Sequence, residues 1–181
     1  MILGMSLATY TLLHVLISLL GIASGIILMY GFLTSKRFDR WTLFFLITTV
    51  LTSVTGFGFP FTRLLPSHIL GILSLIALTV AIFARYGGKM QGSSRWIYVI
   101  TASIALYFNV FVLVVQSFEK APSLHALAPT QKEPPFAIAQ LIVLALFVVL
   151  TVVAVKRFHP EGTLTGTSNT ANTRSNERRV A

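Results

Sequence analysis

The sequence predicts an all-α integral membrane protein, a bundle of five transmembrane helices with the N-terminus outside and the C-terminus in the cytoplasm. Composition is the first observation that supports this class: 55% of the 181 residues are apolar and only 10% are charged, whereas about a quarter of an average soluble domain is charged. The second is that five stretches contain no Asp, Glu, Lys or Arg: 1–35, 41–62, 64–84, 96–118 and 134–155. Each can cross the roughly 30 Å hydrocarbon core, which takes about 20 helical residues.

The predicted spans around these stretches are 7–33, 41–59, 67–86, 96–118 and 137–157. A short basic turn follows the first span, and Pro60 ends the second because proline cannot continue a helix. A Gly- and Ser-rich loop, 87–95, separates the third span from the fourth. Prolines bound the connection 119–136, where we expect a short surface helix around Ser123–Ala128.

Two domains follow from this pattern. Residues 1–158 form the five-helix transmembrane domain. Residues 159–181 are mainly Thr, Ser, Asn, Gly and Arg, a composition with too little apolar surface to fold, and we expect a disordered cytoplasmic tail.

The basic residues set the orientation. Eleven of the fourteen follow the first, third and fifth spans, and only Arg63, Lys120 and Lys132 follow the second and fourth. Because cytoplasmic loops carry the excess of Lys and Arg, the N-terminus is expected outside. The formal charge of +9 therefore reflects topology, and we expect no nucleic-acid partner.

Residue usage excludes several kinds of chemistry. The chain contains no Cys, which removes disulfides, thiolate metal sites and cysteine nucleophiles. No His/Asp spacing typical of zinc is present. The charge-free stretches leave no ionised side chain inside a span, so a proton relay or voltage sensor has no carrier.

Neutral polar side chains gather in the predicted outer half of the bundle. Three hypotheses explain them. In the first, the amides and imidazoles only hydrogen-bond between helices. In the second, an outward-facing ligand pocket is lined by His14, Asn109, Gln116 and Gln140, with flat walls from Tyr10, Tyr107, Phe108 and Phe111. In the third, His14 and His68 ligate a b-type haem and Arg63 pairs with a propionate.

A small-residue pair lies on the same face of the first span as His14. Gly21 and Gly25 form a G-x-x-x-G pattern, which lets membrane helices approach closely. We expect this face to pack against another helix of the same chain.

Three segments carry a resemblance: 34–72, 105–118 and 125–136. Together they resemble a family of small multi-pass bacterial inner-membrane proteins, which implies that location and no particular activity. A fainter similarity to membrane b-type cytochromes depends on His14 and His68 alone.

The function that the sequence favours is non-enzymatic. It is either binding of a small hydrophobic ligand in the outward-facing polar pocket or support of a membrane complex, with the lipid bilayer, another membrane protein or a second copy as partner. The alternatives are a haem- or quinone-linked electron-transfer subunit and a transporter or channel component.

Overall fold

The computed structural model describes residues 4–60 and 66–160. Of these residues 82% are helical and none lies in a strand, which confirms the all-α class. The elements are α1 (Leu7–Leu33), α2 (Asp39–Gly56), α3 (Pro66–Ile82), the π-helix η1 (Phe83–Gly87), α4 (Ser93–Lys120), α5 (Pro122–Leu127) and α6 (Pro134–Arg157). The predicted surface helix after the fourth span is confirmed as α5.

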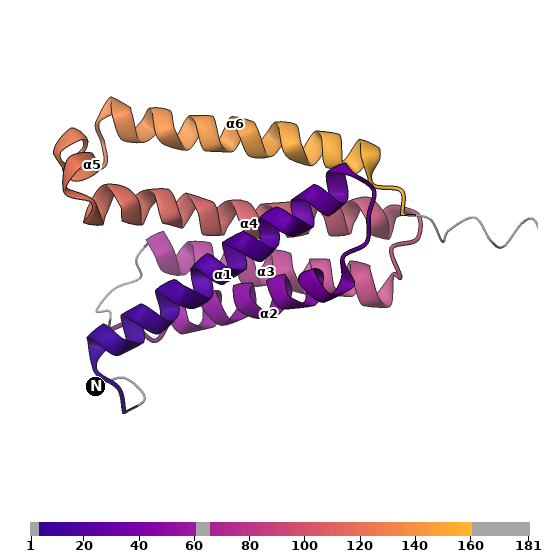
Figure 1. The fold of residues 1–181 in the computed structure, drawn as a ribbon, viewed down its shortest axis with the longest axis horizontal. Helices are drawn as coiled ribbons and strands as arrows, with labels where there is room; N and C mark the ends of the chain where they lie inside the picture. The colour runs from indigo at the N-terminus through magenta and orange to yellow at the C-terminus, as the bar shows by residue number, and fades with distance from the viewer. Residues whose placement is uncertain (1–3, 61–65, 161–181) are drawn as a thin grey trace, which may run out of the picture.

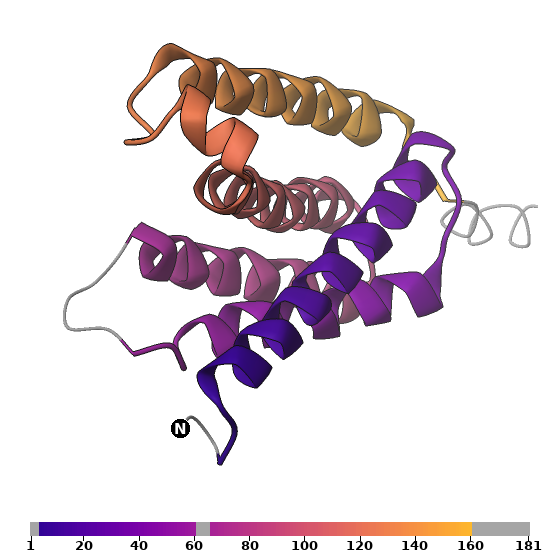
Figure 2. The same ribbon diagram turned by 60° about the vertical axis from the view of Figure 1, so that its left-hand side comes forward.

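The five long helices run in alternating directions, and α1 crosses the others obliquely in both views (Figures 1 and 2). α1 packs on α2, and α4 packs on both α3 and α6. The connections at residues 34–38 and 88–92 lie at one end of the bundle together with the end of α6 (Figure 1). We call this the basic end, and we call the opposite end, where α5 lies, the α5 end.

Four helical segments in the described part of the chain are long and apolar enough to cross a membrane: Leu7–Leu33, Ser67–Gly87, Ser93–Lys120 and Pro134–Arg157. α2 is not among them because it begins with Asp39 and Arg40 and carries several Thr and Ser residues over only 18 residues. Leu, Ile and Val side chains remain exposed along α1 and α6. This exposed apolar surface is typical of a membrane-embedded protein, since lipid tails cover it there.

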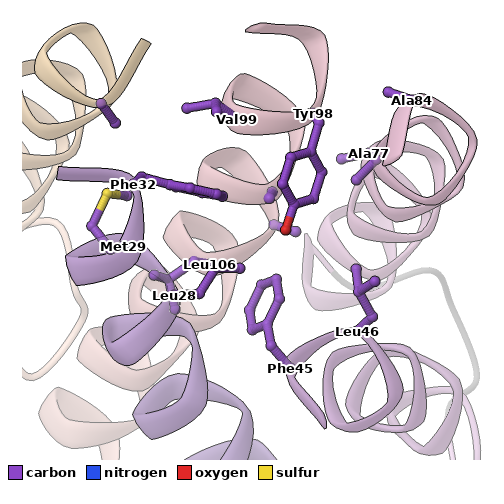
Figure 3. Packing of buried hydrophobic residues seen from close by; sticks show 14 of the residues in the cluster. Leu28, Met29, Phe32, Phe45, Leu46, Ala77, Ala84, Tyr98, Val99 and Leu106 are labelled. Carbon is purple, nitrogen blue, oxygen red and sulfur yellow. The ribbon is translucent and has the colours of Figure 1, made fainter. Parts of the chain in front are cut away.

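The main apolar core lies toward the basic end, where α1, α2, α3 and α4 meet. Phe32, Phe45, Tyr98 and Val99 are almost completely buried. Tyr98 stands between side chains of α1 and α3 and directs its hydroxyl toward the α2 residues Phe45 and Leu46 (Figure 3). The buried apolar cluster therefore lies at the end of the bundle where charged residues gather.

Side-chain contacts also fix the last helix at the basic end. The Arg95 guanidinium donates to the backbone oxygens of Val155 and Phe158, which satisfies carbonyl groups that a helix end leaves without partners. The His159 backbone N–H donates to the Ser35 hydroxyl over 2.8 Å. Residues 161–181, the greater part of the predicted tail, lie outside the described residues.

Candidate functional site

His14 joins α1 to the end of α2. Its Nδ1 lies 2.8 Å from the Thr55 hydroxyl oxygen, and that hydroxyl donates to the Leu51 carbonyl over 2.7 Å. Since the hydroxyl has one proton, this geometry makes Nδ1 the donor to Thr55. The imidazole packs edge-on against Phe59, with ring centroids 5.2 Å apart. One turn earlier, the Tyr10 hydroxyl donates to the Thr55 carbonyl over 2.7 Å.

Asn109 faces the interior of the bundle at a different level. It is buried, and its Nδ2 lies 3.5 Å from the Thr49 hydroxyl oxygen and against Gly21 of α1. Gly21 follows His14 by seven residues, about 10 Å of helix, so the two side chains do not share one level. Residue counts along the two helices do not give their relative depth, because α1 crosses the bundle obliquely (Figure 2).

The two predicted glutamines have different environments. Gln140 is buried in the contact between α6 and α4, and its Nε2 donates to the Phe111 backbone oxygen over 3.2 Å. Gln116 is exposed on α4. The structure therefore does not gather His14, Asn109, Gln116 and Gln140 around one cavity. His14, Asn109 and Gln140 instead each link a different pair of elements by a hydrogen bond.

The residues of the haem hypothesis also have separate surroundings. His68 is buried, and its ring stacks on Phe57 with centroids 5.6 Å apart, whereas His14 packs on Phe59. The two imidazoles thus pack on different phenylalanines. Arg63 lies outside the described residues. Within the described ranges, no group of three or more His, Asp or Glu residues is placed to hold a metal ion.

A groove between α4 and α6 offers a different kind of site. It is a shallow, open groove with a volume of about 240 Å³, and it is lined by Ile100, Ser103, Ile104, Tyr107, Phe147, Val148, Thr151 and Val152. The Tyr107 ring packs against both Phe111 and Phe147, with centroids 6.0 and 5.6 Å away. Tyr107 is one of the four aromatic residues predicted to form walls of the outward-facing pocket, and it lines this groove instead. The walls are almost entirely apolar, because Ser103 is buried and donates its hydroxyl to the Val99 carbonyl over 2.7 Å. Tyr107 and Thr151 are the other residues of the lining that carry a hydroxyl.

Arg85 shows that the expectation of spans without ionised side chains was wrong. It belongs to η1, and only 7% of the residue is exposed. The guanidinium forms an ion pair with Asp39 of α2 and donates to the Tyr98 hydroxyl over 3.2 Å. The Tyr98 ring also lies 5.2 Å from the guanidinium carbon, within cation–π range.

This buried network was not predicted from the sequence, because Arg85 lies at the end of the predicted third span, 67–86, and was counted among the basic residues that set the orientation. The helix in fact continues through η1 to Gly87. A π-helical turn contains an additional residue, so side chains after it face a different direction from that of a continuous α-helix. Asp39 was the available signal, since it is the only acidic residue before Glu119.

The four apolar spans and the exposed apolar surface define the class, a helical bundle typical of membrane-embedded proteins. The particular family is not defined, because no protein-family model, curated protein or solved structure matches the chain.

Proposed function

We propose that the chain is a five-span protein of a bacterial inner membrane that binds a small hydrophobic ligand in the groove between α4 and α6. The groove carries this proposal, because its lining combines apolar walls with a tyrosine and a phenylalanine ring and with the hydroxyl-bearing residues Tyr107 and Thr151. Ligand sites are typically of this kind, mainly apolar with a few polar groups that fix orientation.

The proposal assigns His14 and Asn109 a structural role. Both make hydrogen bonds to threonines of α2, and such interhelical bonds stabilise membrane bundles by about 0.6–2 kcal/mol each. This arrangement favours the first of the three hypotheses for these two residues. Haem ligation by His14 and His68 stays a prediction.

The proposed ligand site can be tested by filling the groove. A photoreactive long-chain alcohol, added to the purified protein in detergent, should label residues 100–107 or 147–152, located by mass spectrometry. Thr151→Trp should reduce this labelling about tenfold, because excluding two methylene groups already costs about 1.6 kcal/mol.

Val149→Trp is the matched control, since valine has the shape of threonine and Val149 is exposed on the same helix away from the groove. This variant should keep the wild-type labelling. Labelling spread evenly along α6, or equal labelling of the two variants, would contradict the proposed site.

The five-span topology is supported by the alternating helix directions and by the charge at the basic end. The basic residues described at this end are Lys36, Arg37, Arg40, Arg85, Lys89, Arg95, Lys156 and Arg157. Asp39 is the acidic residue described there. At the α5 end, Glu119 and Glu133 balance Lys120 and Lys132. This asymmetry favours a cytoplasmic basic end.

A reporter enzyme that is active only outside the cytoplasm tests this topology. We expect activity when the reporter is fused after Arg63 or Lys132, and none when it is fused after Lys89 or Arg174. The absence of native Cys permits a second assay with single introduced cysteines. Efficient labelling of a Gly88→Cys variant by an impermeant reagent from outside would overturn the orientation.

A further inference from the structure

The outer face of α2 is an apolar stripe that ends in a basic residue. The polar residues of α2 face the bundle, where the buried ones are Thr42, Thr48, Thr49 and Ser53. On the outer face, exposed apolar residues follow one another at steps of three or four: Phe44, Ile47, Leu51 and Val54. Arg40 is also exposed, and it precedes Phe44 by four residues, so it lies on the same face. The stripe is about 15 Å long and has a cationic end.

Exposed aromatic side chains gather at this end of the bundle. In the part of the chain that the structure describes, they are Tyr30, Trp41, Phe44, Phe83, Tyr86 and Trp96. They belong to α1, α2, η1 and α4, and all lie within about two helical turns of the connections 34–38 and 88–92. Trp and Tyr are enriched where a bilayer meets water, at the level of the lipid headgroups. These aromatic residues therefore indicate that the headgroup layer lies at the first turn of α2.

The positive charge beside the stripe is not cancelled by the neighbouring acidic residue. Asp39 forms an ion pair with the buried Arg85, so the charge of the carboxylate is already compensated. Arg37 lies 3.8 Å from the same carboxylate, and Lys36 and Arg40 are exposed next to it in the chain. This surface thus keeps an excess of positive charge, and anionic lipids are the counter-charges that a headgroup layer offers.

We infer that this face of α2 binds an anionic phospholipid. The headgroup phosphate pairs with Lys36 and Arg40, and an acyl chain lies along the apolar stripe. The Trp41 ring packs edge-on against Phe44, with centroids 6.3 Å apart, and borders the stripe next to the headgroup. A zwitterionic lipid fits this surface less well, because the positive group of its own head competes for the phosphate. The site lies on α2, so it is separate from the α4–α6 groove and its ligand.

The experiment measures quenching of Trp41 fluorescence by phospholipids whose acyl chains carry bromine near the headgroup. The chain has two tryptophans, so a Trp96→Phe variant reports on α2 alone. In vesicles of equal parts phosphatidylglycerol and phosphatidylcholine, bromination of phosphatidylglycerol should quench Trp41 more strongly than bromination of phosphatidylcholine. We expect a preference of at least about fivefold, the factor that one Lys or Arg near an anionic surface supplies.

Lys36→Gln/Arg40→Gln should remove most of this preference. The matched control is Lys156→Gln/Arg157→Gln, which removes the same charge from the basic end but on α6, across the bundle from α2 (Figures 1 and 2). The control should keep the preference. Equal quenching by the two brominated lipids in the protein with all its basic residues would overturn the inference, and that measurement needs neither charge variant to fold. Equal preference in the two charge variants would overturn it as well, because the lipid would then respond to the overall charge of the basic end.

Discussion

Replacing Asp39 with Asn should lower the free energy of unfolding by about 2 kcal/mol. Removing one partner of a fully buried ion pair costs about 3–5 kcal/mol. The value expected here is smaller because the Asp39 side chain is 65% exposed and water screens it. Arg85 is buried and keeps the Tyr98 hydroxyl and the Met90 sulfur as acceptors, but it loses its counter-charge. Equilibrium unfolding of the detergent-solubilised protein measures the loss.

Two further variants test the physical reason. Arg37 also lies near Asp39, with Nε 3.8 Å from the carboxylate, but both side chains are about half exposed or more. Arg37→Gln should therefore cost no more than about 0.5 kcal/mol. The double variant Asp39→Asn/Arg85→Met should recover most of the loss, because it removes the buried charge as well. An Asp39→Asn protein as stable as Arg37→Gln would mean that Tyr98 and Met90 alone satisfy Arg85.

The helices were predictable because their signal is long and continuous. The first span coincides with α1, and an apolar stretch of that length is typical of a membrane-spanning helix. The boundaries of the other helices shift by a few residues, since amphipathic first turns such as Ser93–Arg95 can be helical without being apolar. The prediction of a fifth span at 41–59 stays a prediction, because α2 is shorter and more polar than the other four.

The candidate site was less predictable, because side-chain partners depend on how helices cross. The sequence indicates that His14, Asn109 and Gln140 are polar groups in apolar helices, and hence need partners. It does not indicate that α1 crosses obliquely, which separates His14 from Asn109 by about two helical turns. The α4–α6 groove could not be predicted from the sequence, because most of its lining residues are apolar like their neighbours in the same helices. They form a groove only because α4 and α6 pack side by side.

Replacing Gly25 with Leu should lower the free energy of unfolding by about 3 kcal/mol, the upper part of the range for overpacking. A Cβ atom built on Gly25 collides with the Leu106 side chain and lies 2.9 Å from Phe45 Cε2. Both neighbours are buried, and the Phe45 ring is completely enclosed, so neither has room to move. α1 must therefore separate from α2 and α4, which is visible as a lower melting temperature in detergent.

Gly21 is the matched control. The G-x-x-x-G pattern predicts the same close helix contact at both glycines, whereas in the structure the space around them differs. A Cβ atom on Gly21 meets Thr48 Oγ1, Asn109 Nδ2 and Thr49 Oγ1 at 3.4–3.5 Å, which is ordinary van der Waals contact. Gly21→Ala should therefore be nearly neutral, whereas Gly25→Ala should already cost about 1 kcal/mol. Equal stability of the two alanine variants would show that α1 does not contact Phe45 and Leu106 as closely as the structure places it. The close approach of the helices would then depend on the contacts of Thr48, Thr49 and Asn109 around Gly21.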